Sequence, residues 1–154
     1  MSVFTAFEAV AARQPDRLAL QIKEATGYRR LTYGVAARQA RTLAAALLRA
    51  GVVPGDRIAL VSENRPEWTV AYFAVTAAGA TAVPLDVQLS DAEVANVLRH
   101  AGCRMAIASG KQAPRLLGVD AGGPVPLRVV DLDTEASGGR TLSFQAIVRE
   151  SGEL

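Results

Sequence analysis

The chain has 154 residues, of which 50% are hydrophobic and 21% are charged, with one cysteine and a formal net charge of +2. This length and composition are typical of one folded domain and exclude a disordered chain, while the single cysteine excludes an internal disulfide framework and fits a reducing compartment. The longest apolar stretch, residues 71–85, is shorter than the ~20 residues of a membrane span, so we expect a soluble, cytoplasmic protein.

The first third of the chain predicts a helix, a hairpin and a second helix. Thr5 and Glu8 have the spacing of a capping box, which predicts the start of a short helix. The runs 18–22 and 28–31 are separated by a turn and predict a β-hairpin. Thr32 is the expected cap of a longer helix. Its apolar side chains recur at helical spacing and form one face: Ala36, Ala40, Leu43, Ala44 and Leu47.

The middle of the chain carries the strongest structural signal. Residues 57–61 form an apolar run that is typical of a strand buried on both faces. Asn64 and Glu67 have capping-box spacing and predict a helix start, and Gly79 is the expected helix end before a second apolar run, 80–83. Strand, helix and strand within about 30 residues form a βαβ unit, which predicts two parallel strands and a right-handed crossover.

The same alternation continues to the end of the chain. Ser90 and Glu93 form another capping box, and Ser143 is the expected cap of a last helix. Between them we expect a strand at 105–108, a helix at 111–117 and a strand at 127–132. The sequence therefore predicts an α/β fold: a largely parallel β-sheet with helices on both faces, in three α/β/α layers, plus the N-terminal hairpin.

Three short motifs carry a family resemblance. They are Leu31-Thr32-Tyr33, the run Asn64-Arg65-Pro66-Glu67-Trp68, and Ala78-Gly79 followed by Val83-Pro84-Leu85-Asp86. Together they resemble the N-terminal part of AMP-dependent acyl-CoA synthetases, in the adenylate-forming superfamily, and the second motif is most similar to fatty-acyl-CoA ligases. The first motif departs from the family pattern, with Val35 and Ala36 where glutamate and leucine are usual.

The resemblance covers nearly the whole chain but only the opening part of such an enzyme. The family's phosphate-binding loop, rich in Ser, Thr and Gly, and its mobile C-terminal domain have no counterpart in these 154 residues. We therefore expect residues 1–154 to be the N-terminal α/β subdomain of a long-chain fatty-acid-CoA ligase, inactive alone because it lacks the groups that stabilise the transferring phosphate. The resemblance implies that the parent enzyme uses ATP, Mg²⁺, CoA and a fatty acid, with the rest of the ligase chain as the partner of this piece.

Two other functions remain open. The chain could begin a peptide-synthetase domain that adenylates an amino acid, although the run 64–68 argues against this. It could also be a free-standing α/β binding module that assembles through an exposed apolar face, possible as a homo-oligomer. The downstream pocket residues would decide the first alternative, and sizing chromatography with an ATP and CoA screen would decide the second.

The charge distribution does not indicate a nucleic-acid partner. Residues 1–57 hold nine basic and four acidic residues, and residues 58–154 hold eight and eleven. Basic side chains are not interleaved with aromatic ones, and no nucleic-acid-binding motif is present. We interpret Arg38, Arg41 and Arg49 as the solvated face of the second helix, opposite its leucines.

Several side chains are candidates for chemistry, but each has a structural interpretation that we favour. His100 and Cys103 are too few for a metal site, which needs three or four ligands. Asp131 and Asp133 lack a third carboxylate and are expected in a solvated turn.

The turn 62–65 lies where parallel sheets bind phosphates, but it has no glycine, and Glu63 would repel an anion. We interpret Trp68 as core packing, not as an acyl-pocket wall. We assign no catalytic, cofactor-binding or metal-binding residue within this chain.

Overall fold

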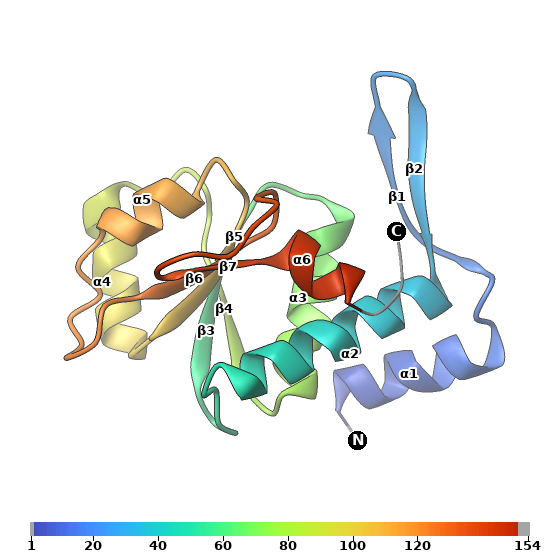
Figure 1. The fold of residues 1–154 in the computed structure, drawn as a ribbon, viewed down its shortest axis with the longest axis horizontal. Coiled ribbons are helices and arrows are strands. Elements are labelled where there is room, and N and C mark those ends of the chain that lie inside the picture. The colour runs from blue at the N-terminus through green and yellow to red at the C-terminus, as the bar shows by residue number, and fades with distance from the viewer. Residues whose placement is uncertain (1, 151–154) are drawn as a thin grey trace.

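The fold is α/β, as the sequence predicts, in a computed structural model that describes residues 2–150 (Figure 1). In chain order the elements are α1 (Val3–Arg13), β1 (Leu18–Glu24), β2 (Gly27–Thr32), α2 (Tyr33–Arg49), β3 (Arg57–Val61), α3 (Pro66–Ala77), β4 (Thr81–Pro84), α4 (Asp91–Ala101), β5 (Met105–Ala108), α5 (Ala113–Gly118), β6 (Arg128–Asp131), β7 (Thr141–Ser143) and α6 (Phe144–Arg149). No helix among the described residues is both long and apolar enough to cross a bilayer.

The main sheet has five strands in the order β4-β3-β5-β6-β7, and every neighbouring pair is parallel. Its central strands are apolar on both faces because both faces are covered, and all four residues of β5 are buried. Strand β7 was not predicted from the sequence, because three residues are too short to show a strand pattern. The hairpin of β1 and β2 is a separate antiparallel sheet that projects from the body (Figure 1).

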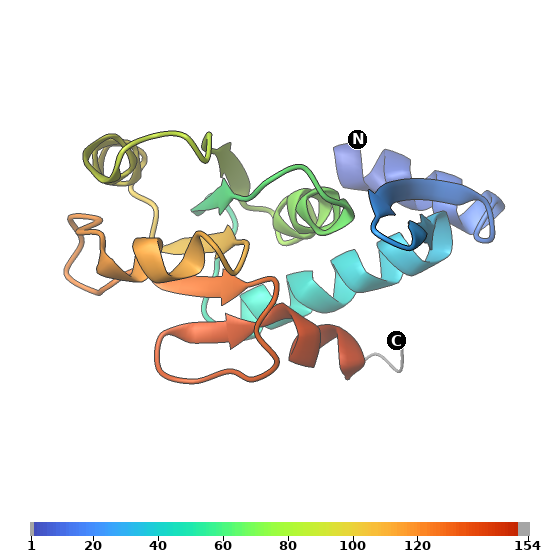
Figure 2. The same cartoon turned by 90° about the horizontal axis from the view of Figure 1, so that it is seen from above.

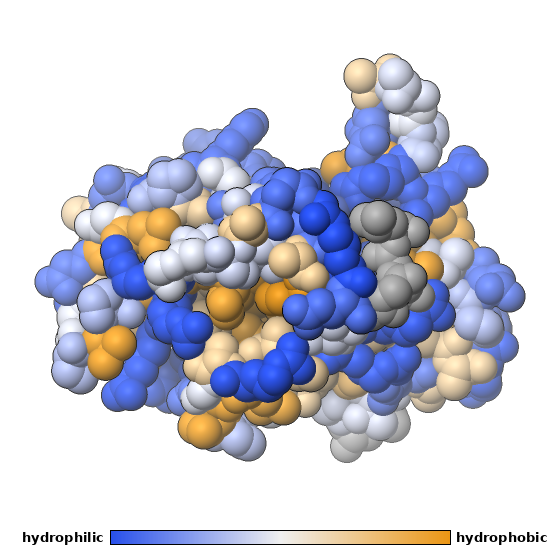
Figure 3. All heavy atoms as spheres, in the orientation of Figure 1, coloured by the Kyte–Doolittle hydropathy of each residue, from blue (hydrophilic) through white to orange (hydrophobic). Residues whose placement is uncertain are grey.

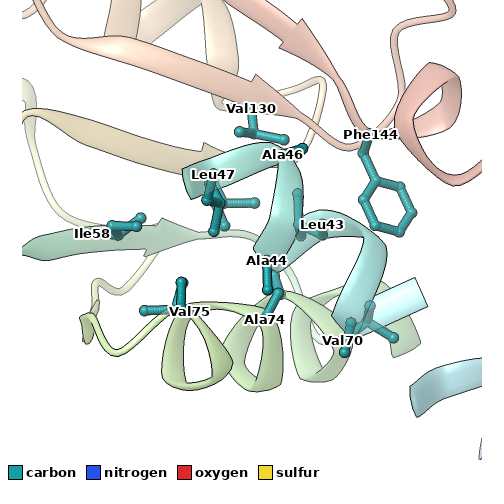
Figure 4. Packing of buried hydrophobic residues seen from close by; sticks show 14 of the residues in the cluster. Leu43, Ala44, Ala46, Leu47, Ile58, Val70, Ala74, Val75, Val130 and Phe144 are labelled. Atoms are coloured by element: carbon teal, nitrogen blue, oxygen red, sulfur yellow. The ribbon is translucent and has the colours of Figure 1, made fainter. Parts of the chain in front are cut away.

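Helices cover the two faces of the main sheet and create two cores. In Figure 2 the strands lie between α4 and α5 on one side and α2, α3 and α6 on the other. The larger core packs α2 and α3 against the sheet, with Leu47 of α2 close to Ile58 of β3 and Val75 of α3 (Figure 4). The smaller core places Val94 and Leu98 of α4 against the opposite face. Alternate residues of β3 enter the two cores, as a strand's period of two requires.

The first helix and the hairpin lie beside the larger core. Phe7 of α1 stacks on Phe73 of α3 with ring centroids 4.1 Å apart, and the centroid of the Tyr33 ring lies 5.6 Å from that of Phe7. On the face seen in Figure 1, apolar surface is visible in a hollow between hydrophilic side chains (Figure 3). The outer surface of this face is therefore mixed in polarity.

The caps that the sequence predicts form at three helices. Thr32 accepts a hydrogen bond from the Val35 amide at 3.3 Å, Ser90 forms a full capping box with Glu93, and Ser143 accepts from the Ala146 amide at 2.9 Å. These three predictions are confirmed, because each cap depends only on residues three positions apart in the sequence.

Two predicted caps are wrong. Helix α1 begins earlier than expected, and its N-cap is Ser2, whose hydroxyl accepts from the Thr5 amide at 3.1 Å. Helix α3 has Arg65 as its N-cap residue, without a side-chain cap. The capping box of Asn64 and Glu67 does not form, because the Glu67 carboxylate accepts hydrogen bonds from Arg29 of the hairpin and from the neighbouring Arg65.

Candidate functional site

The carboxyl ends of the parallel strands form the most structured polar region of the molecule. The chain leaves β3 toward α3 on one face of the sheet and leaves the adjacent β5 toward α5 on the other. Diverging connections of this kind open a crevice between neighbouring strands, which is where open α/β sheets bind ligands. The loops after β3, β5 and β6 meet at this end of the sheet.

Five charged side chains join these loops to the hairpin, and we call them the carboxyl-end network: Glu24, Arg29, Arg65, Glu67 and Asp133. Arg29 donates to Glu24 at 2.8 Å and to Glu67 at 2.6 Å. Arg65 donates to Glu67 at 2.8 Å and to both carboxylate oxygens of Asp133, at 2.9 and 2.7 Å. Asp133 also accepts from the Gly110 amide at 2.7 Å, so one chain of contacts links β2, α3 and the loops after β5 and β6.

Glu67 is the centre of this network, because it is only 6% exposed. Burial by itself would raise the pKa of the Glu67 carboxyl group, but hydrogen bonds from Arg29 and Arg65 outweigh burial and lower that pKa. The hydrogen bond from Arg65, followed by the Gly110 amide, lowers the pKa of Asp133 against the opposing effect of burial. Both carboxylates are therefore ionised at neutral pH. The network holds the backbone of these loops in place, and the charge of Arg65 is paired with two carboxylates.

A second contact joins the loop after β3 to the loop after β5. Ser109 is 1% exposed and lies near enough to Glu63 to lower the pKa of that carboxyl group, with smaller contributions from Gln112 and Lys111. The Ser109 hydroxyl forms no hydrogen bond of normal geometry within residues 2–150. The Ser109 hydroxyl is therefore buried at the crevice close to Glu63, without a well-formed hydrogen bond to it.

Two hollows flank the start of α3. One of about 410 Å³ lies between β1 and α3 and is lined by Leu20, Ile22 and Trp68 among others. The other, of about 490 Å³, lies at the ends of β3 and β4 and is lined by Glu63, Trp68 and Asp86 among others. Trp68 is half-buried and stacks on Tyr72 with centroids 5.8 Å apart, so it both packs on the core, as predicted, and borders two hollows.

The two pairs of candidate residues, His100 with Cys103 and Asp131 with Asp133, have structural roles. His100 is exposed in the last turn of α4, while Cys103 is 3% exposed and packs in the smaller core. Burial raises the pKa of the Cys103 thiol to about 11, so it behaves as an apolar side chain. Asp131 accepts from the amides of Asp133 and Thr134 in a turn, as expected. Asp133 is exposed in the same turn, as expected, and its carboxylate is also ion-paired with Arg65.

The described carboxylates do not provide a Mg²⁺ site of their own. Within residues 2–150 no group of three or more histidine, cysteine, aspartate or glutamate side chains is arranged to hold a metal ion. Both oxygens of Asp133 are taken by Arg65, and Asp131 accepts from backbone amides. Residues outside this stretch would have to complete any site for a metal-bound nucleotide.

Comparison with known proteins identifies the family. A family model described as AMP-binding enzyme matches residues 7–150. The chain belongs to the AMP-binding enzyme family. It is 34% identical, over 94% of its length, to a methyl-dioxo-octahydroindenyl-propanoyl:CoA ligase of Mycobacterium tuberculosis, and it spans 28% of that enzyme.

Solved structures place this chain in the N-terminal portion of adenylate-forming enzymes. A protein of Rhodopseudomonas palustris assigned as a long-chain-fatty-acid CoA ligase matches with a TM-score of 0.81 and 27% identity, over 96% of this chain and 36% of that one. A nonribosomal peptide synthetase in its AMPPNP-bound form matches with a TM-score of 0.72 and 29% identity, over 86% of this chain and 13% of that one. Enzymes of the family that are ligases use ATP, Mg²⁺ and CoA in general.

One motif that carries the family resemblance contributes to the carboxyl-end network, but sequence reasoning missed the network itself. Arg65 and Glu67 are part of the motif that carries the family resemblance, whereas Arg29 and Asp133 are 38 residues before Glu67 and 68 residues after Arg65. A buried glutamate in the first turn of a helix is a weak sequence signal, because glutamate is also common there when exposed. The buried hydroxyl of Ser109 gives no sequence signal.

Proposed function

We propose that residues 1–154 are the N-terminal α/β subdomain of an AMP-forming ligase that activates a long-chain fatty acid, and that they form one wall of its catalytic crevice. The observation that carries this proposal is the carboxyl-end network, which fixes the loops at the crevice while keeping its own charges paired. A wall of this kind supplies shape and preorganised backbone, and other parts of the ligase supply the groups that contact the reacting phosphate.

The chain alone is then catalytically silent. Transfer of the adenylyl group needs cations aimed at the triphosphate, and Arg65 is already committed to Glu67 and Asp133. ATP, Mg²⁺, CoA and the fatty acid are therefore ligands of the whole ligase, and the rest of the ligase chain is the direct partner of this piece. The fatty acid is favoured by the similarity of Asn64-Arg65-Pro66-Glu67-Trp68 to fatty-acyl-CoA ligases and by the match to the Rhodopseudomonas palustris protein.

A chimera tests this function. The corresponding segment of the Rhodopseudomonas palustris protein would be replaced by this chain, and ATP–pyrophosphate exchange measured with palmitate, octanoate, ferulate and a mixture of amino acids. We expect acid-dependent exchange with palmitate by the chimera, and exchange at background level by the 154-residue chain alone. Exchange above background by the chain alone would contradict the proposal that this subdomain is inactive by itself.

A second candidate rests on the match to the peptide synthetase, which also covers most of this chain. In that case the parent protein adenylates an amino acid, and the same subdomain serves as the same wall. Amino-acid-dependent exchange by a chimera built on that synthetase, without palmitate-dependent exchange by the first chimera, would favour this alternative.

A further inference from the structure

The opposite, amino end of the main sheet contains a pocket that the proposed function does not use. Arg57 is the first residue of β3, Arg104 directly precedes β5, and Arg128 is the first residue of β6. These three strands are neighbours in the sheet, so the arginines come together at one end of it. They line a pocket of about 310 Å³ together with apolar side chains that include Val53, Met105 and Val125. We call it the amino-end pocket.

The three guanidinium groups at this pocket differ from other arginines of the chain in how they are paired. Among the described residues none of them forms an ion pair, whereas Arg41, Arg65 and Arg115 are each paired with a carboxylate. The one acid that lines the pocket, Asp56, accepts a hydrogen bond from the Val53 amide at 2.9 Å. With three guanidinium groups and one carboxylate in its lining, the pocket carries a net positive charge.

Two of the guanidinium groups are held in place by backbone. Arg57 donates to the Ala101 carbonyl, and Arg128 donates to the Ala50 carbonyl at 2.8 Å. Each of these bonds uses one N–H group and leaves the remaining donors of the fork available. Anchoring by neutral carbonyls orients a cation without neutralising it, which is how a preorganised anion site is built.

The arrangement also has a cost that a bound anion would remove. Ile58 of β3 is paired with Met105 of β5, so the residues that precede them, Arg57 and Arg104, occupy neighbouring positions at the amino end of the sheet. Like charges in neighbouring positions of two strands destabilise a sheet. An anion between them turns that repulsion into two charge-assisted hydrogen bonds.

We propose that the amino-end pocket binds a small phosphate monoester that has a compact apolar group. A phosphoryl dianion matches the charge and fork geometry of several guanidinium groups better than a single carboxylate does. Val53 and Val125 are 56% and 58% exposed at the pocket, and they would cover the apolar group. A volume of about 310 Å³ lies at the small end of the range for ligand sites, which favours a compact ligand.

This site is distinct from the catalytic crevice. It lies at the other end of strands of four or five residues, which separates the two by roughly 15 Å along the strand direction. It depends on no adenylating activity, so its test does not depend on the outcome of the chimera experiment.

Amide NMR spectra of the 154-residue chain, titrated with phenyl phosphate at low salt, test the proposal. We expect saturable shifts around Arg104, Met105 and Val125 with a dissociation constant of about 1 mM or lower. Inorganic phosphate lacks the apolar group and benzyl alcohol lacks the charge, so each should bind at least about tenfold more weakly than phenyl phosphate. Shifts that do not saturate by about 10 mM phenyl phosphate, or equal binding of inorganic phosphate, would overturn the proposal.

Variants make the test specific. Arg104→Gln removes a cation whose side chain forms no hydrogen bond or ion pair among the described residues, and we expect it to weaken phenyl phosphate binding about tenfold without loss of fold. Arg13→Gln is the matched control, because Arg13 is exposed at the end of α1, and it should leave binding unchanged. Equal affinity of the Arg104→Gln variant and the parent chain would contradict the site.

Vesicles that contain phosphatidic acid separate a soluble phosphate from a lipid headgroup, which offers the same phosphoryl chemistry. We expect no cosedimentation of the chain with these vesicles, since the pocket is sized for a small molecule. Cosedimentation that the Arg104→Gln variant loses would assign the phosphate to a lipid and overturn a soluble ligand.

Discussion

The two ends of the main sheet use arginine in opposite ways. At the carboxyl end, Arg29 and Arg65 are paired with carboxylates from distant parts of the chain, and their charges are cancelled in holding loops together. At the amino end, Arg57, Arg104 and Arg128 line one pocket, and none of them is paired with a carboxylate in residues 2–150. The same residue type therefore acts as a structural connector at one end and as an open cation at the other.

The difference depends on what the guanidinium group is hydrogen-bonded to, more than on exposure alone. A carboxylate partner cancels the charge and resists removal, because either partner left alone in a partly buried place is destabilising. A carbonyl partner orients the charge and leaves it available. Replacing side chains at the two ends should therefore have very different effects on stability.

The largest effect is expected at Glu67. In the Glu67→Gln variant Arg29 and Arg65 lose their shared carboxylate, and we expect a loss of ~2–3 kcal/mol in the free energy of unfolding. This is below the range for fully buried pairs, because the Arg29 side chain is 36% exposed. Thermal unfolding should show a midpoint lowered by about 5–10 °C.

The matched control is Glu8→Gln, which breaks the exposed pair with Arg41 and should cost no more than about 0.5 kcal/mol. Equal midpoints for the two variants would mean that the carboxyl-end network does not stabilise the fold.

Acid should remove the same stabilisation. The pKa values of Glu67, Asp133 and Glu63 are lowered in the folded chain from usual values of 4.5, 3.8 and 4.5. Their contribution is therefore fully present above about pH 5 and is lost as the pH falls through the lowered pKa values of the folded state. Urea unfolding at a series of pH values should show constant stability from neutral pH to about pH 5 and a progressive loss below it.

The double variant Glu67→Gln with Asp133→Asn separates this cause from general acid unfolding. Its stability should be lower at neutral pH and should fall less steeply below pH 5 than that of the parent chain, since two of the titrating groups are gone. Parallel profiles for the two proteins would show that other carboxylates dominate.

Two buried serines sharpen the comparison within the carboxyl end. Ser143 caps α6 and donates to the Thr134 carbonyl at 2.6 Å, so Ser143→Ala should cost about 1–2 kcal/mol. Ser109 has no such well-formed hydrogen bond among the described residues and lies close to Glu63, so Ser109→Ala should change stability by no more than about 0.5 kcal/mol. Denaturant midpoints measure both, and a loss at Ser109 as large as that at Ser143 would show that its hydroxyl has a partner in solution.

The sequence predicted the parts of this molecule that depend on near neighbours. The strands at 57–61 and 105–108 follow from apolar runs, and the caps Thr32, Ser90 and Ser143 depend on residues three positions away. The parallel sheet followed from the regular alternation of strands and helices. Strand β7 was not predicted, because its pairing with β6 provides almost all of its strand character.

The parts that the sequence did not predict are made by contacts across the fold. Glu67 looked like half of a capping box with Asn64, but the long-range partner Arg29 takes its carboxylate. Pairing of Arg65 with Asp133 follows only from the strand order, which places the loop after β6 near the start of α3. The convergence of Arg57, Arg104 and Arg128 likewise needs β3, β5 and β6 to be neighbours, and spacing along the chain does not reveal this.

The smallest effect is expected at Arg104, and it is the sharpest test of the contrast between the two ends. Arg104 has no ion pair among the described residues and lies beside Arg57, so Arg104→Gln removes a repulsion and no attraction. We expect a change within about 0.5 kcal/mol, toward higher stability at low salt, that shrinks as salt screens the two charges. Urea unfolding at low and high salt measures it. A loss as large as that of Glu67→Gln would mean that Arg104 is a structural connector like Arg65, and the two ends of the sheet would then use arginine in the same way.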